Sequence, residues 1–252
     1  MSCGRHKDVG DLENKLVIVT GAGRGNGASI ARGMAGEGGE VWGIDLNFPG
    51  MDMNHLSRSI IGDVADPDFV ASTCAEATST GREIVLVNNA GVTLPSPRPY
   101  PNDKWFETIR VNLTAPFLWI EGVSPAMINC NGGSIINITS LAAERAFPDN
   151  PAYAASKGGL KQLSKSYAKT LGAFNVRVNN VGPGYIRTSM TSQSFANSER
   201  RELLSKQTLL GRLGETEDLV GVCLFLAGPN SSYITGQDIY VDGGWLANGV
   251  SD

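Results

Sequence analysis

An apolar run from Leu16 to Thr20 leads directly into the glycine-rich segment GAGRGNG, and a helical pattern follows it. A short, continuous apolar run is typical of a parallel strand that is buried on both faces of a sheet. Gly21, Gly25 and Gly27 would permit a tight turn and bring backbone N–H groups at the helix N-terminus close to a diphosphate. Glycine-rich turns are common, so the inference depends on the position of this turn between a strand and a helix. We therefore expect a nucleotide-binding strand–turn–helix unit.

Composition excludes several classes of function. The 252 residues carry a net charge of −4 and include 41% hydrophobic and 18% charged residues, which is ordinary for a globular protein. The acidic balance and the lack of a Lys/Arg cluster argue against a nucleic-acid partner. Four scattered cysteines and two histidines form no metal-binding pattern, so we expect no metal. The polar N-terminus and the lack of a long apolar run predict a cytoplasmic protein without a signal peptide or membrane span.

Strand-like and helix-like segments alternate along the rest of the chain. This alternation predicts a doubly wound α/β fold on a parallel sheet, in a single domain from 13 to 252 that follows a flexible tail at 1–12. Between Leu46 and Arg58 the chain is rich in Pro, Gly, Asn and Asp, so we expect an irregular connection there. Further strands are expected near residues 40–45, 59–64, 82–92, 134–139, 175–181 and 237–244, and further helices near 67–79, from 102 onward, and near 151–173, 198–206 and 215–226.

Two acidic residues at strand ends predict contacts with the adenosine half of a dinucleotide. Asp45 ends the second strand, where a carboxylate can accept hydrogen bonds from both ribose hydroxyls and would repel a 2′-phosphate. Asp45 could instead be an ordinary surface turn residue, and Arg24 could favour a phosphate. We predict NAD, with NADP as the less favoured cofactor. Asp63 and Val64 are expected to close the third strand and to hold the adenine by one polar and one apolar contact.

The fourth strand ends in the small and polar residues from Asn88 to Gly91. Small residues at the carboxyl end of a strand let a ligand lie across it. Asn112 falls inside the helix that begins near residue 102, where asparagine is mildly unfavourable unless it is exposed or functional. Pro116 follows four residues later, so we expect a freed carbonyl and a bend near Asn112.

A hydroxyl, a phenol and an ammonium group are expected to meet near the end of the fifth strand. Ser140 follows that strand, and Tyr153 and Lys157 lie four residues apart, on one face of the next helix. A phenol is a weak acid at neutral pH, and a fixed cation beside it lowers the phenol pKa. A Tyr–x–x–x–Lys pair also occurs by chance, and a serine at a strand end is often only a turn residue. The three groups together predict an acid–base site.

In combination, these motifs resemble those of the short-chain dehydrogenase/reductase family. The pattern T-G-x-x-x-G-x-G runs from Thr20 to Gly27, N-N-A-G from Asn88 to Gly91, and P-G is Pro183–Gly184. Asn26 departs from the pattern, which usually has an apolar residue there. The resemblance extends from Leu16 to Gly244 and implies a Rossmann-like, doubly wound, seven-stranded parallel sheet with helices on both faces. It also implies a small-molecule alcohol or ketone substrate and a homo-oligomer, either a tetramer or a dimer.

The resemblance implies a role for each catalytic side chain. Tyr153 would exchange a proton with the substrate oxygen, which Ser140 would hydrogen-bond. Lys157 would hold the nicotinamide ribose and lower the pKa of Tyr153, and Asn112 would support a water chain that relays the proton to solvent. The residues implied to contact the cofactor are Gly21, Arg24, Gly25, Asn26, Gly27, Asp45, Leu46, Asp63, Val64, Asn89, Ala90, Gly91, Tyr153, Lys157, Pro183, Gly184, Ile186 and Thr188.

Polar side chains in two loops suggest the class of substrate. Glu144 and Arg145 follow Ser140, although they could simply pair with each other at the surface, and Lys161 to Lys169 are expected to form a solvated face of the helix. The segment from Tyr185 to Asn197 is rich in Ser, Thr and Gln and is expected to be a mobile lid. Polar groups in these places suit a sugar, a polyol or a sugar acid.

Two other functions are weighed against this one. An NADPH-dependent 3-oxoacyl-thioester reductase is the alternative, but Asp45 opposes NADPH, and the run from Pro148 to Lys157 lacks the G-Q-x-N-Y segment that usually accompanies that activity. A non-catalytic nucleotide-binding regulator is less expected, because it would not need Ser140, Tyr153 and Lys157 together.

Overall fold

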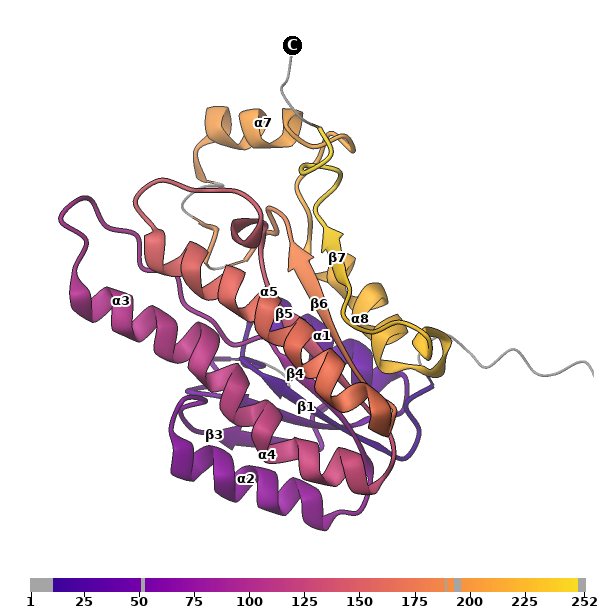
Figure 1. Ribbon diagram of the computed structural model, residues 1–252. Coiled ribbons are helices and arrows are strands. Elements are labelled where there is room, and N and C mark those ends of the chain that lie inside the picture. The colour runs from indigo at the N-terminus through magenta and orange to yellow at the C-terminus, as the bar shows by residue number, and fades with distance from the viewer. Residues whose placement is uncertain (1–10, 51–52, 189, 193–195, 249–252) are drawn as a thin grey trace, which may run out of the picture.

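The structure, a computed structural model, describes residues 11–50, 53–188, 190–192 and 196–248. Its strands are β1 (Lys15–Thr20), β2 (Glu40–Asp45), β3 (Arg58–Ile61), β4 (Glu83–Asn88), β5 (Gly133–Ile138), β6 (Val176–Pro183) and β7 (Asp238–Val241). They form a seven-stranded sheet in the order β3-β2-β1-β4-β5-β6-β7, and every neighbouring pair is parallel (Figure 1). The predicted doubly wound sheet is therefore confirmed.

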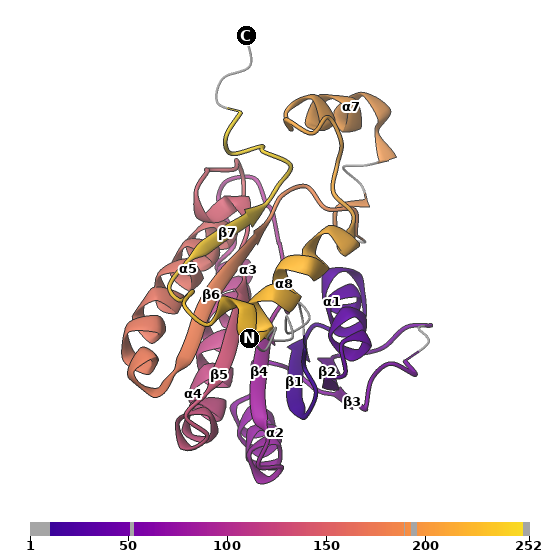
Figure 2. The same cartoon turned by 90° about the vertical axis from the view of Figure 1, so that its right-hand side faces the viewer.

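Helices cover both faces of the sheet because the side chains of its strands alternate between two cores. Leu16 and Ile18 of β1 belong to the core on one face, and Val17 and Val19 belong to the core on the other. Figure 2 shows α1 and α8 on one side of the sheet and α4 and α5 on the opposite side. The helices are α1 (Gly25–Gly36), α2 (Pro67–Ser79), α3 (Asn102–Ile109), α4 (Ala115–Asn129), α5 (Pro151–Leu171), α7 (Ser198–Lys206) and α8 (Val220–Ala227).

The strand order reverses at β1, which lies between β2 and β4. In a doubly wound sheet the crevice outside the carboxyl ends of the strands at this reversal is the usual ligand site. The glycine-rich turn follows β1, Asn89 follows β4 and Ser140 follows β5, so the candidate residues from distant parts of the sequence reach the same edge of the sheet.

Two predicted boundaries are wrong. Leu12, expected at the end of a flexible tail, is fully buried, and its N–H donates to the carbonyl of Glu37. The third strand ends at Ile61 rather than at Val64, because β2, its partner among the described residues, ends at Asp45, which is paired with Ile61. Residues 1–10 of the expected tail lie outside the described part of the chain.

The irregularity expected near Asn112 is confirmed. A π-helical turn, η1 (Arg110–Thr114), separates α3 from α4, and Ala115 N donates to the carbonyl of Arg110, five residues earlier. Pro116, at the start of α4, has no N–H with which to continue the regular ladder. Asn112 therefore lies in a widened turn, of a kind often found at functional sites.

The connection between β2 and β3 contains no helix in its described residues, as expected. Of the predicted lid from Tyr185 to Asn197, Ser189 and residues 193–195 lie outside the described residues. No helix in the described part of the chain has the length and apolar character needed to span a membrane.

Candidate active site

The turn after β1 is shaped to receive a ligand at the start of α1. Gly21 and Gly25 have φ angles of 68° and 56°, in the left-handed region that favours glycine. A Cβ atom on Gly27 would lie 2.0 Å from the carbonyl oxygen of Gly21, so only glycine fits there. Arg24, the N-cap residue of α1, makes no side-chain capping bond. Uncapped N–H groups at a helix N-terminus suit the diphosphate of a dinucleotide.

Thr20 and Asn89 fix the position of this turn. The Thr20 hydroxyl oxygen accepts hydrogen bonds from the N–H groups of Asn89 (3.0 Å) and Ala90 (3.1 Å). Asn89 Nδ2 donates in return to the carbonyls of Thr20 (2.9 Å) and Gly21 (3.1 Å). The Asn89 side chain therefore holds the glycine turn against the end of β4, a supporting role that the sequence did not reveal.

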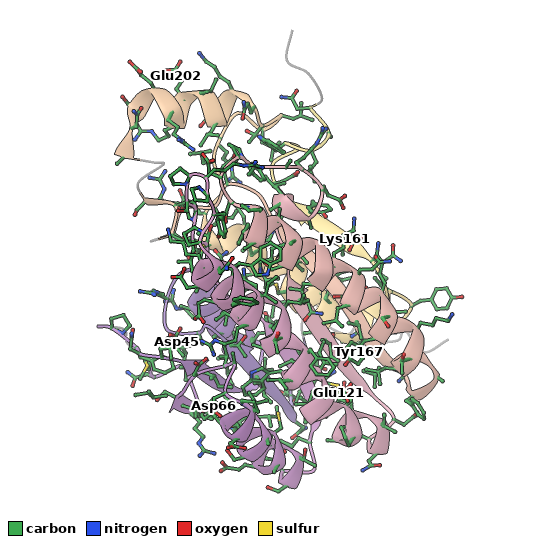
Figure 3. The ribbon with its side chains drawn as sticks, turned by 60° about the vertical axis from the view of Figure 1, so that its left-hand side comes forward. Asp45, Asp66, Glu121, Lys161, Tyr167 and Glu202 are labelled. Carbon is green, nitrogen blue, oxygen red and sulfur yellow. The ribbon has the colours of Figure 1, made fainter. Side chains whose placement is uncertain are left out.

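Asp45 borders the turn on the side expected for the adenosine ribose (Figure 3). Its Oδ2 accepts a hydrogen bond of 2.9 Å from Gly23 N, and Asn47 N lies 3.4 Å from its Oδ1. Arg24, which follows Gly23, and Leu46, which follows Asp45, are both exposed. The carboxylate is thus held at the end of β2 and remains partly exposed, as a ribose contact requires.

The predicted adenine contacts lie beyond β3. Asp63 accepts hydrogen bonds from Ala65 N (2.9 Å) and from Arg110 Nη1 (2.8 Å). The Val64 carbonyl accepts a hydrogen bond of 3.0 Å from the indole N–H of Trp119. Because Arg110 is the first residue of η1, its ion pair with Asp63 joins the expected adenine edge to the turn that carries Asn112.

Four further predicted cofactor residues lie at the end of β6 or just after it, namely Pro183, Gly184, Ile186 and Thr188. Gly184 N donates to the carbonyl of Val241, and Ile186 is buried in an isolated bridge with Gly214. A Cβ atom on Gly25 would lie 3.5 Å from Thr188 Cγ2, so Thr188 stands over the start of α1. The segment after β6 therefore passes close to the glycine turn.

Ser140, Tyr153 and Lys157 meet at the carboxyl end of β5. Ser140 follows the strand and hydrogen-bonds the Tyr153 side chain. Lys157 is buried, its Nζ donates a 2.7 Å hydrogen bond to the carbonyl of Ile138, and this Nζ lies 5.9 Å from the centroid of the Tyr153 ring. The structure thus brings together the three side chains that the sequence singled out.

Asn112 connects the π turn to α5 and to the loop after β4. Its Oδ1 accepts a hydrogen bond from Val92 N (2.8 Å), and its Nδ2 donates to the carbonyl of Val92 (2.9 Å) and to Ser156 Oγ (3.1 Å). A Cβ atom on Gly91 would lie 3.3 Å from Asn112 Oδ1 and 3.6 Å from Lys157 Nζ. Asn112 therefore positions its neighbours, and Ser156, which the sequence did not single out, is one of its partners.

The predicted pKa of Tyr153 is wrong in direction. Burial raises the pKa of the Tyr153 phenol, and the hydrogen bond with Ser140 opposes this rise only in part. Burial also lowers the pKa of Lys157 to about 8, because a charged ammonium is poorly solvated there. Desolvation by burial is therefore the largest influence on the pKa values of both groups.

Lys157→Met is expected to stabilise the fold at neutral pH. Burial lowers the Lys157 pKa from 10.5 to about 8. Below pH 8 the charged lysine therefore lowers the free energy of unfolding by roughly 3 kcal/mol. The lost hydrogen bond to Ile138 offsets about 1 kcal/mol of that. Between these pKa values the unfolded chain binds more protons than the folded one, so wild-type stability rises with pH. Lys157→Met should therefore have a free energy of unfolding about 1–2 kcal/mol above that of the wild type near pH 7, and this difference should disappear near pH 10.

Urea unfolding at the two pH values measures this difference. Lys169→Met, at an exposed position on the same helix, is the matched control. This substitution should change the free energy of unfolding little at either pH. A Lys157→Met variant that is less stable than the wild type near neutral pH would contradict the expected cost of the buried charge.

Glu144 has hydrogen-bond partners within the protein that the sequence did not reveal. It accepts hydrogen bonds from Lys161 and from the Tyr240 hydroxyl (2.7 Å), which lower its pKa. Asp238 pairs with Lys165 at 2.7 Å and with Lys161 at 3.7 Å. The expected solvated lysine face is therefore wrong for these two lysines, because β7 brings Asp238 beside α5. Nor does Glu144 pair with its neighbour in sequence.

A chain of polar side chains crosses the buried face of the sheet below α5. Asn88 Nδ2 donates to Asn137 Oδ1 (2.8 Å), and Asn137 Nδ2 donates to Ser164 Oγ (2.8 Å). Ser164 Oγ donates to Asn180 Oδ1 (2.6 Å), and Asn180 Nδ2 donates to Asp238 Oδ1 (2.7 Å). All but Asp238 are buried. This polar chain fixes the helix that bears Tyr153 against four strands, and asparagines inside strands were its only sequence signal.

Comparison with known proteins identifies the family. A family model described as enoyl-(acyl carrier protein) reductase matches residues 21–246. The gluconate 5-dehydrogenase of Gluconobacter oxydans is 34% identical over 249 residues, which cover 95% of this chain and 97% of that protein. The chain belongs to the short-chain dehydrogenase/reductase family. It is therefore an NAD(P)-dependent oxidoreductase that acts on CH–OH groups.

Other members of the short-chain dehydrogenase/reductase family are equally similar. The solved structure of a gluconate 5-dehydrogenase from Burkholderia cenocepacia in complex with NADP and tartrate has a TM-score of 0.89 and 31% identity, with 95% of this chain and 98% of that chain covered. A 3-oxoacyl-(acyl-carrier-protein) reductase from Chlamydia trachomatis is 37% identical over 246 residues, which cover 93% of this chain and 98% of that protein.

Proposed function

We propose that this short-chain dehydrogenase uses NAD to interconvert a secondary alcohol and a ketone in a polar, hydroxylated substrate such as a sugar, a polyol or a sugar acid. The observation that carries the proposal is the meeting of Ser140, Tyr153 and Lys157 at the end of β5, across the crevice from the glycine turn. When bound, the nicotinamide cofactor supplies the hydride chemistry. Tyr153 exchanges the proton of the substrate oxygen, and Ser140 orients that oxygen by a hydrogen bond.

Lys157 and Asn112 support this proton exchange. Lys157 is held by Ile138 at the end of β5, where its ammonium can bind a ribose hydroxyl, and Asn112 fixes the loop that faces it. The glycine turn, Asn89 and Thr188 provide the surface for the diphosphate. Every predicted cofactor-binding residue thus keeps the role assigned from the sequence as part of this proposal, including Asn26 beside the turn.

Similarity to a gluconate 5-dehydrogenase supports the hydroxylated substrate class. The polar lid residues Thr188 and Thr191 add to that support, since their hydroxyls are linked at 3.3 Å next to the crevice. The alternative function, NADPH-dependent reduction of 3-oxoacyl thioesters, is favoured by the similarity to the 3-oxoacyl reductase. Asp45 supports the first function, because a carboxylate at the end of β2 would repel a 2′-phosphate.

A cofactor and substrate screen distinguishes the two functions. The absorbance of reduced nicotinamide is followed with NAD and NADP across sugars, polyols, sugar acids and simple secondary alcohols, and in the reverse direction with 3-oxoacyl thioesters. Reduction of NAD by one class of hydroxylated substrates is the expected result. Activity confined to NADPH and thioesters would replace the first function by the second.

Asp45→Ser is expected to weaken the preference for NAD. Removal of the carboxylate removes two hydrogen-bond acceptors for the ribose and the repulsion of a 2′-phosphate, so we expect about a tenfold or greater rise in the Michaelis constant for NAD and a smaller gap between NAD and NADP. Asp68→Asn, an exposed carboxylate on α2, changes the net charge equally and is the control. Unchanged constants for both cofactors in Asp45→Ser would show that Asp45 does not select the cofactor.

The proposal includes a homo-oligomer, either a tetramer or a dimer, in the cytoplasm. Support for association comes from large apolar side chains on the outer helices, of which Phe106 of α3 is 68% exposed and Phe117 of α4 is 42% exposed. Apolar groups of this size on neighbouring helices are typical of surfaces that pack against another chain.

A further inference from the structure

Three aromatic side chains gather above the edge of the sheet where the catalytic groups lie. Phe147 comes from the loop after β5, Tyr185 from the segment after β6, and Trp245 from the segment after β7. Because parallel strands end at the same edge of a sheet, the three rings lie on the same side as Ser140. Phe147 also belongs to the connection that joins Ser140 to the catalytic helix. We refer to Phe147, Tyr185 and Trp245 as the aromatic wall.

Trp245 is the centre of the aromatic wall. Its ring is stacked on that of Phe147, with centroids 6.2 Å apart and an interplanar angle of 26°. Its centroid is 6.0 Å from that of Tyr185, with an angle of 73°. Such offset and edge-on contacts are the preferred arrangements of aromatic rings. The three rings therefore form one continuous apolar surface made from three separate loops.

Polar contacts behind the rings hold Trp245 in place. The indole N–H donates a 3.2 Å hydrogen bond to Gln207 Oε1, just after α7. The carboxylate of Asp242 accepts hydrogen bonds of 2.9 Å from Gly244 N and Leu246 N, which fixes the turn on which Trp245 stands. Because the indole N–H already has a partner, Trp245 offers a ligand its ring surface rather than a hydrogen-bond donor.

The aromatic wall is only partly buried. Phe147, Tyr185 and Trp245 are each of intermediate burial, so part of their surface remains exposed. Binding sites for small molecules commonly combine such aromatic surfaces with a few placed polar groups. Here the polar groups at the same edge of the sheet include Ser140, which the connection carrying Phe147 joins to the helix of Tyr153.

We propose that the aromatic wall packs against the apolar C–H face of a cyclic substrate, so that the enzyme prefers ring compounds such as aldopyranoses or hydroxylated cyclohexanes to open-chain polyols and sugar acids. This inference rests on the proposed function, whose substrate class it narrows. A rigid ring presents several C–H groups in one plane to the aromatic surface while its hydroxyls point to the sides. An open chain has to lose more conformational freedom to make the same contact.

Steady-state kinetics on matched panels of cyclic and open-chain alcohols test the proposal. Trp245→Leu should lower kcat/KM for cyclic substrates about tenfold or more, mainly through KM, and change the values for open-chain substrates less than about twofold. Trp245→Phe keeps an aromatic ring, so its kcat/KM for cyclic substrates should lie between those of Trp245→Leu and the wild type. This variant replaces Trp245→Leu in the test if the leucine variant does not fold. Trp105→Leu, a partly exposed tryptophan on α3, is the control and should affect neither panel.

Binding is measured separately from turnover by calorimetric titration of the NAD-loaded wild type with the same compounds. A cyclic alcohol that binds through Trp245 without being oxidised would sustain the aromatic wall and refute the proposed function. Oxidation of open-chain alcohols in preference to cyclic ones would refute the aromatic wall and sustain the proposed function. Equal losses of kcat/KM on both panels in Trp245→Leu would show that the rings only anchor the end of the chain. A failure of every cyclic compound to bind would also refute the aromatic wall as a substrate contact.

Discussion

Tyr153→Phe is expected to lower kcat at least about a thousandfold and to leave the affinity for the nicotinamide cofactor within about threefold of the wild type. The substitution removes the phenol that hydrogen-bonds Ser140 and keeps the ring that packs beside Lys157. Proton exchange with the substrate oxygen then has no positioned group, whereas the glycine turn and Asp45 remain as they were. Initial rates give kcat, and fluorescence titration with reduced cofactor gives the affinity.

Tyr167→Phe provides a matched control on the same helix. The Tyr167 hydroxyl donates to Glu121 of α4, and the two side chains lie beside each other in Figure 3. Tyr167 is fourteen residues after Tyr153 on α5, which is about four helical turns. Removal of this phenol should leave kcat within about twofold of the wild type. Comparable activity of Tyr153→Phe and Tyr167→Phe would show that Tyr153 is not the acid–base group, and the mechanism would need another proton acceptor.

Gly27→Ala is expected to abolish measurable cofactor binding and to lower the free energy of unfolding by several kcal/mol. The added Cβ would lie 2.0 Å from the carbonyl oxygen of Gly21 and 2.4 Å from Asn89 Nδ2. Neither neighbour can move freely, because Gly21 is part of the turn and Asn89 is hydrogen-bonded to it. The turn must open, and the N–H groups at the start of α1 then lose their placement around a diphosphate.

Gly36→Ala, at the other end of α1, is the control for this substitution. A Cβ atom there would meet nothing within 4 Å, so alanine should be neutral or stabilise the helix by up to about 1 kcal/mol. Thermal unfolding with and without cofactor measures both variants. If Gly27→Ala keeps the stabilisation that the wild type gains from cofactor, the turn does not bind the diphosphate.

Local sequence patterns predicted the fold and the centre of the site well. The apolar run at Leu16–Thr20 fits only a strand covered on both faces, and the glycines after it fit only a tight turn. Tyr153 and Lys157 are related by helix geometry alone, so their shared face follows from their spacing. Pro116 likewise predicted the irregular turn around Asn112, because a missing N–H acts on its immediate neighbours.

Features that depend on distant pairs were not predictable in the same way. The third strand was predicted to be too long, because its end is set by Asp45 of β2 rather than by its own residues. Glu144 was assigned to the substrate because nothing near it in sequence indicated Lys161 and Tyr240 as partners. The pKa of Tyr153 depends on how deeply the helix packs, and spacing along the chain carries no information about depth.

The polar chain from Asn88 to Asp238 has a consequence for attempts to recombine this enzyme with its relatives. Each link joins side chains from different strands or from α5, and each interior member is buried, so exchange of one segment leaves donors and acceptors of its neighbours without partners. The effects of substitutions along it should therefore be non-additive. In chimaeric enzymes the half of the sheet from β4 to β7, with α5, would have to be inherited as one block.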